Sequence, residues 1–119
     1  MNRMWILLAV ALAAGCGMSS GVTLPSEAPS IEGTIQQSGA NQAGRRILVE
    51  ATAPVAGRES AAYITVLPGT AVLAGSGETV VQASADELVV GARVRVWFTG
   101  PVAESFPVQA TAGTVLILR

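Results

Sequence analysis

The chain has 119 residues with eight acidic residues, seven arginines and neither lysine nor histidine, which gives a formal net charge of −1 at pH 7. Such sparse, balanced charge offers no cation cluster for nucleic-acid phosphates, so we expect no nucleic-acid partner. Without histidine the commonest general base and metal ligand is missing, and one cysteine cannot form an intrachain disulfide. We therefore expect no catalytic site, no metal and no cofactor.

Residues 1–15 have the layout of a secretory signal. Arg3 provides a cationic start, residues 5–14 are apolar, and small residues surround Cys16. The apolar run is shorter than the about 20 residues that a helix needs to cross a bilayer core of roughly 30 Å. A small-residue stretch that ends in cysteine resembles the lipobox of bacterial lipoproteins. That resemblance implies removal of residues 1–15 and lipidation of Cys16 as the new N-terminus.

This resemblance predicts a protein of the cell envelope that is held at a membrane by its N-terminal lipid. Gly17 is not the Asp that retains such proteins in the inner membrane, so we expect the outer membrane if the host has two. An ordinary secretory signal that leaves a free thiol is the alternative, because Ala13 stands where the lipobox family usually has Leu. A buried apolar helix of a cytosolic protein is less favoured, since the run has no amphipathic pattern.

The lipidated cysteine and a flexible linker are predicted over residues 16–30. Gly and Ser loosen this segment, while Pro25 and Pro29 extend it, which is typical of a spacer. The alternative is an arm that is partly ordered and packs on the domain.

Residues 31–119 are predicted to form one all-β domain, because apolar and polar residues alternate along them in short runs. Strands are expected over 31–36, 46–51, 61–67, 93–99 and 110–118, with a brief continuation of the third at 71–73 and a sixth, short strand as an option at 79–82. A turn is expected at 39–44 and loops at 52–60 and 100–109. Ser84 and Glu87 have capping-box spacing and predict a helical turn over 84–88. Five or six short strands with one helical turn favour a small closed OB-like barrel, with a β-sandwich as the alternative.

The segment from Gly91 to Ala110 carries a specific pattern. It combines a Gly-x-x-Val-x-Val strand with Gly100-Pro101 and a Glu-Ser-Phe-Pro-Val-Gln-Ala stretch that starts at Glu104. In these features the chain resembles the YobA-like domain of unknown function, found in small secreted and lipid-anchored bacterial proteins. The resemblance implies an OB-like β-domain and brings no activity, cofactor or catalytic residue.

Two groups of residues are candidates for a binding site. Glu104, Ser105 and Gln109 lie in the proline-stiffened loop 100–109, which we expect Phe106 to anchor to the barrel. In OB-folds the loop between the last two strands commonly borders the ligand face. The alternative is that these polar groups only hold the turn together.

Arg95 and Trp97, together with Arg93, share one face of a strand and form the second group. An arginine beside an indole is able to hold an anionic or aromatic ligand by cation–π contact. The alternative is an ordinary strand face on which the arginine stems cover the ring.

From these features we expect a monomeric, non-enzymatic envelope lipoprotein whose barrel binds a protein partner or a small ligand. Two alternatives stay open. One is a structural or regulatory envelope protein without a ligand pocket. The other is a periplasmic enzyme or enzyme subunit that uses carboxylates, which by themselves can carry out acid–base chemistry.

Overall fold

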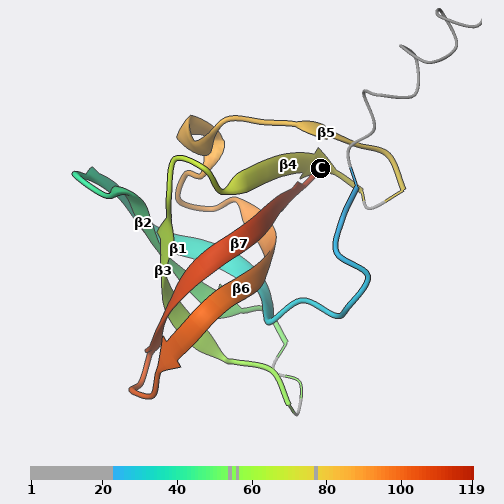
Figure 1. The fold of residues 1–119 in the computed structure, drawn as a ribbon. Helices are drawn as coiled ribbons and strands as arrows, with labels where there is room; N and C mark the ends of the chain where they lie inside the picture. Colours follow the sequence, from blue (N-terminus) through green and yellow to red (C-terminus); the bar gives the residue numbers. More distant parts are fainter. Residues whose placement is uncertain (1–22, 54, 56, 77) are drawn as a thin grey trace, which may run out of the picture.

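The computed structural model describes residues 23–53, 55, 57–76 and 78–119 (Figure 1). The predicted signal peptide, the predicted lipidation site Cys16 and the first part of the predicted linker lie outside these residues. Within the described ranges, no helix has the length and apolar character needed to span a membrane.

The described domain is all-β, as predicted, with a single 3-10 turn. Its elements in chain order are β1 (Ile31–Asn41), β2 (Gly44–Ala51), β3 (Ala61–Val66), β4 (Ala71–Gly75), β5 (Val80–Gln82), η1 (Ala85–Glu87), β6 (Arg93–Ala103) and β7 (Val108–Leu118).

Five of the strands close into a barrel. The sheet order is β3-β2-β1-β6-β7-β4-β5, and an additional pairing joins β3 to β7. This closing pairing is parallel, while β1–β2, β2–β3, β1–β6 and β6–β7 are antiparallel. β7 pairs with β3 at residues 108–111 and then with β4 at residues 114–118. β4 and β5 therefore extend the sheet outside the barrel (Figure 1). The OB-like prediction is confirmed, and closure leaves the barrel strands without open edges.

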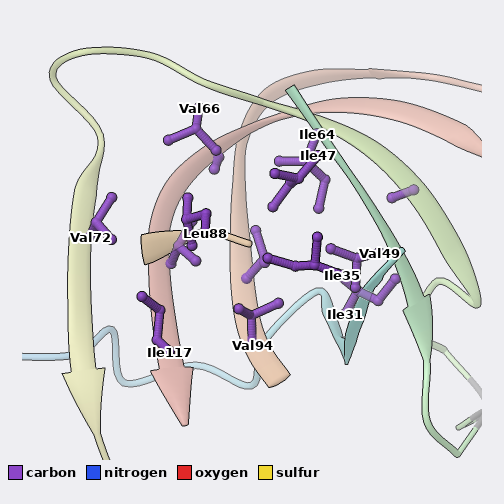
Figure 2. Close-up of a cluster of buried hydrophobic side chains, with 14 of the residues drawn as sticks. Ile31, Ile35, Ile47, Val49, Ile64, Val66, Val72, Leu88, Val94 and Ile117 are labelled. Atoms are coloured by element: carbon purple, nitrogen blue, oxygen red, sulfur yellow. The ribbon is translucent and has the colours of Figure 1, made fainter. Parts of the chain in front are cut away.

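Alternating side chains of the barrel strands fill its interior. Figure 2 shows Ile31, Ile35, Ile47, Ile64 and Val94 directed toward one another, and all five are fully buried. Stability follows from burial of this apolar surface.

Leu88, next to η1, is the one member of the main core cluster that comes from outside the strands, and it is also fully buried. The predicted capping box is present: the Asp86 N–H donates to Ser84 Oγ at 3.2 Å, and the Ser84 N–H donates to Glu87 Oε2 at 3.0 Å. The cap fixes the turn so that Leu88 enters one end of the barrel.

The predicted loop 100–109 is mostly strand, which corrects its boundaries. β6 continues to Ala103 and β7 begins at Val108, so only residues 104–107 connect them. Pro101 fits because the β6–β7 register shifts between Thr99 and Ala103, and Gly100 adopts a φ of +73° there. Proline has no N–H to donate, but at such a bulge no hydrogen bond between the strands requires one.

Residues 24–30 pack against the barrel, which differs from the flexible spacer expected for them. Ser30 N–H donates to the Val96 carbonyl at 2.8 Å, and Ser30 Oγ accepts from Phe98 N–H at 3.0 Å. Leu24 packs on a second apolar cluster formed by Leu73, Trp97 and Leu116. For these residues the structure agrees with the alternative of an ordered arm, because specific contacts with the barrel hold a segment that would otherwise be a free spacer.

Candidate functional site

Trp97 lies in the second apolar cluster rather than on an open face. Its side chain is 7% exposed, and the indole N–H donates to the Glu27 carbonyl at 2.9 Å. Arg95, two residues earlier, places Nε 3.1 Å from Glu32 Oε1 on β1. The indole therefore holds the arm 24–30 in place, and its ring is covered instead of presented to a ligand.

Glu104, Ser105 and Gln109 are exposed at the end of the β6–β7 hairpin. The Ser105 N–H donates to the Ala103 carbonyl at 3.0 Å, and its hydroxyl donates to the Pro107 carbonyl at 2.9 Å. Ser105 thus stabilises the turn, in the way that the structural alternative for this loop expects.

The expectation that Phe106 anchors this turn to the barrel is wrong. The Phe106 side chain is 79% exposed. The turn is held instead by its own hydrogen bonds and by the two strands that it joins, so the aromatic ring is not needed as an anchor.

The two predicted groups do not form one site. Ala103 pairs with Gln109, whereas Trp97 pairs with Thr114 farther along the hairpin. From Trp97 to Ala103 the strand advances by roughly 20 Å, at about 3.3 Å per residue. Any site that includes Gln109 must therefore be completed by residues other than Trp97.

Strand pairing brings Gln109 next to Tyr63, which sequence analysis did not single out. Gln109 pairs with Tyr63, Tyr63 with Leu48, and Leu48 with Gln37, so these residues form one row across β7, β3, β2 and β1. Next to this row, the Arg46 guanidinium carbon lies 4.6 Å from the centroid of the Tyr63 ring. This distance is within the range of a cation–π contact.

A hollow of about 600 Å³ opens beside this contact on the outside of the barrel. We call it the β1–β3 hollow. Its polar or aromatic lining side chains are Gln37, Ser38, Asn41, Arg46 and Tyr63. Amides, hydroxyls and a guanidinium are hydrogen-bonding groups suited to a polar ligand.

Arg46 differs from several other arginines of the domain in its electrostatic environment. Among the described residues, ion pairs join Arg45 to Asp86, Arg93 and Arg95 to Glu32, and Arg119 to Glu87, but none involves Arg46. The guanidinium over Tyr63 therefore keeps its hydrogen-bonding fork available for an anionic group.

Glu87 stabilises the turn η1 and does not line the β1–β3 hollow. The backbone hydrogen bond from Ser84 N–H, followed by the side-chain hydrogen bond from Arg119, lowers the pKa of Glu87 below its ordinary value of 4.5. The Arg119 guanidinium lies 2.6 Å from Glu87 Oε1. In the described part of the chain, no group of three or more acidic, cysteine or histidine side chains is placed to hold a metal ion.

The alternation of residues 46–49 is the sequence signal that pointed to the hollow. Arg46 and Leu48 alternate with buried Ile47 and Val49, and Tyr63 is the only tyrosine of the chain. The pattern places Arg46 on the outer face of its strand, but it does not reveal that Tyr63 is the neighbour of Arg46. That contact depends on the register between β2 and β3.

Comparison with known families gives one match. The model of a family described as "Protein of unknown function (DUF3221)" matches residues 57–119, which is just over half of the chain. No curated protein and no solved structure matches the chain. The matched region begins before β3 and includes the β6–β7 hairpin, whereas Arg46 precedes it.

Proposed function

The chain belongs to the family of proteins of unknown function DUF3221, and from its own residues we propose that it is a non-enzymatic lipoprotein of the cell envelope. In this proposal the barrel binds a small polar ligand in the β1–β3 hollow, and an anionic group of the ligand contacts Arg46. The finer resemblance to YobA-like proteins is compatible with this role, because those proteins are small and secreted or lipid-anchored.

The observation that carries the proposal is the Arg46–Tyr63 contact at the edge of a hollow. An arginine that lacks a carboxylate partner among the described residues and stacks on an aromatic ring is preorganised to bind an anion. Gln37 and Asn41 line the same hollow with neutral amides, which are suited to hydroxyl or amide groups of the ligand. A ligand that combines a carboxylate with such groups fits this lining best.

Binding is tested by NMR titration of the ¹⁵N-labelled domain. The probes are a uronic-acid oligosaccharide, a short peptide with a free C-terminal carboxylate, and the neutral counterpart of each. We expect saturable shifts at Gln37, Arg46 and Tyr63 with a carboxylate probe, and weaker shifts with its neutral counterpart. Probes that shift no residue of the hollow would contradict the proposal and favour a structural or regulatory protein.

Arg46→Ala provides the matched test. A hydrogen bond to a charged group contributes about 1.5–3 kcal/mol, so the variant should bind the responding probe roughly 10-fold to 100-fold more weakly. Arg58→Ala removes an exposed arginine that does not line the hollow and should leave the affinity unchanged. Equal affinities for the wild type and Arg46→Ala would refute the role of this guanidinium.

The envelope location is tested separately. Cells that express the full chain should incorporate labelled palmitate, and Cys16→Ser should abolish the labelling. Fractionation of a host with two membranes should place the protein in the outer membrane. Labelling that persists in Cys16→Ser, or recovery only in the inner membrane, would contradict the corresponding part of the proposal.

A further inference from the structure

The β1 wall of the β1–β3 hollow lies in a part of β1 that extends beyond the closed barrel. β1 pairs with β6 only up to Thr34, and its register against β2 shifts between Ile35 and Gln37. Residues 37–41 continue beside β2, and in the described part of the chain no other strand pairs with them. Figure 1 shows the β1–β2 hairpin projecting from the barrel. The hollow is therefore bordered by a segment that has a strand neighbour on one side only.

A hydroxyl group of this segment ties it to the end of the turn η1. Ser38 Oγ donates to the Leu88 carbonyl at 2.5 Å. The Leu88 side chain is fully buried in the core, so its backbone is a fixed point of attachment. The next residue of β1, Gly39, pairs with Arg46 on β2. The bond to Leu88 thus fixes β1 directly beside the arginine that lines the hollow.

Arg45 supports this attachment with both terminal nitrogens of its guanidinium. Nη1 donates to Ser38 Oγ at 3.1 Å, and Nη2 lies 3.2 Å from Asp86 Oδ1 in η1. The Arg45 side chain is 20% exposed, whereas that of Asp86 is 89% exposed, so the ion pair is the weaker of the two contacts. A planar guanidinium is able to hold two partners in a fixed geometry, which a lysine ammonium does not reproduce. We call Ser38, Arg45 and Asp86 the hairpin brace.

Arg45 and Arg46 are adjacent in β2 and have different surroundings. Successive side chains of a strand point to opposite faces of the sheet. Arg46 lines the hollow and stacks on Tyr63, while Arg45 and Asp86 do not line it. A substitution of Arg45 that keeps its charge therefore reaches a ligand in the hollow only through the position of the hairpin.

We propose that Ser38 and Arg45 are positioning residues of the β1–β3 hollow, which hold its β1 wall in the conformation that binds the ligand. This inference rests on the proposed function, because it concerns the affinity of the same site. The apparent affinity of a site falls in proportion to the fraction of molecules in the binding-competent conformation. Without the brace, the β1–β2 hairpin leaves that conformation more often, and Gln37 and Asn41 lose their fixed placement relative to Arg46.

The test measures the affinity of brace variants for the carboxylate probe that binds the wild type, by the same NMR titration. Ser38→Ala removes the bond to Leu88 and should weaken binding about 5-fold, which corresponds to about 1 kcal/mol for one hydrogen bond. Arg45→Lys keeps the charge but not the double contact and should weaken binding about 2-fold to 5-fold. If only the charge of Arg45 mattered, Arg45→Lys would bind as well as the wild type, and that result would contradict its positioning role.

Ser30→Ala is the matched control for Ser38→Ala. It also removes a hydrogen bond between a serine hydroxyl and the backbone, since Ser30 Oγ accepts from Phe98 N–H at 3.0 Å. Ser30 does not line the hollow. This variant should lower the melting temperature and leave the probe affinity unchanged, which separates positioning from a general loss of stability.

Hydrogen exchange in the absence of ligand measures the brace by itself. In Ser38→Ala and Arg45→Lys, the amides of residues 38–46 should exchange faster than in the wild type, because the hairpin opens locally. Amides in the part of β6 that pairs with β7 should keep their exchange rates, and Ser30→Ala should not accelerate exchange at the hairpin.

Three results would overturn this inference while the proposed function stands. One is equal probe affinity of Ser38→Ala and the wild type. The second is unchanged hydrogen exchange at the β1–β2 hairpin in Ser38→Ala, since the hairpin would then be held without the brace. The third is an equal loss of affinity in Ser38→Ala and Ser30→Ala. A wild type that binds no probe would instead refute the proposed function, and the positioning role would fall with it.

Discussion

Leu88→Ala tests whether the turn η1 closes the end of the barrel. Leu88 is fully buried among side chains from the strands, and Figure 2 shows it between Val72, Val94 and Ile117. Replacement by alanine removes buried methyl groups and leaves a cavity, which destabilises proteins by about 2–5 kcal/mol. In a domain of this size 1 kcal/mol corresponds to about 4–8 °C, so the melting temperature should fall by at least about 8 °C.

Urea unfolding followed by the fluorescence of Trp97 measures the change, and thermal unfolding followed by circular dichroism gives an independent value. Val90→Ala is the matched control, because Val90 lies two residues away and is 63% exposed. It should change the free energy of unfolding by less than about 0.5 kcal/mol. A loss below about 1 kcal/mol in Leu88→Ala, similar to the control, would refute the view that this side chain fills the barrel end.

Three further predictions concern the frame around the site. A Cβ at Gly33 would overlap the Glu50 carbonyl oxygen, so Gly33→Ala should lower the melting temperature sharply, whereas Gly39→Ala, which has open space, should not. Trp97→Phe removes the hydrogen bond to Glu27, worth about 1 kcal/mol, and limited proteolysis should cut the arm 24–30 faster; an unchanged rate would contradict its role. The folded-state pKa of Glu87 is lowered, so its stabilisation is present above pH 4.5 and is lost as the pH falls through that folded-state pKa. The difference in urea midpoint between the wild type and Glu87→Gln should therefore shrink on acidification, and a constant difference would refute this linkage.

Local sequence patterns were enough to predict most strands of the domain and its barrel architecture, although not the extension of β6 and β7 into residues 100–109. Alternation of side chains is a local property of a strand, so residues such as Ile47, Val49, Val94 and Val96 could be assigned to the core before any pairing was known. The capping box of Ser84 and Glu87 was equally readable, because both partners lie within one turn. Short strands, one turn and the need to remove open edges then favoured the closed OB-like barrel.

The position of the candidate site depends on tertiary contacts. Trp97 and Arg95 were expected to share an accessible face, yet the arm 24–30 covers the indole. Phe106 was expected to be an anchor, yet its side chain is exposed at the end of the β6–β7 hairpin. These outcomes depend on contacts between residues far apart in the chain, which the composition of a segment does not encode.

The Arg46–Tyr63 contact also depends partly on a local sequence pattern and partly on long-range strand pairing. Alternation indicated that Arg46 faces away from the core, but its neighbour on that face is set by the register between β2 and β3. A shift of one residue would turn Tyr63 to the opposite face of the sheet. Local patterns therefore determine which side chains point outward, and the long-range register decides which of them meet to form a site.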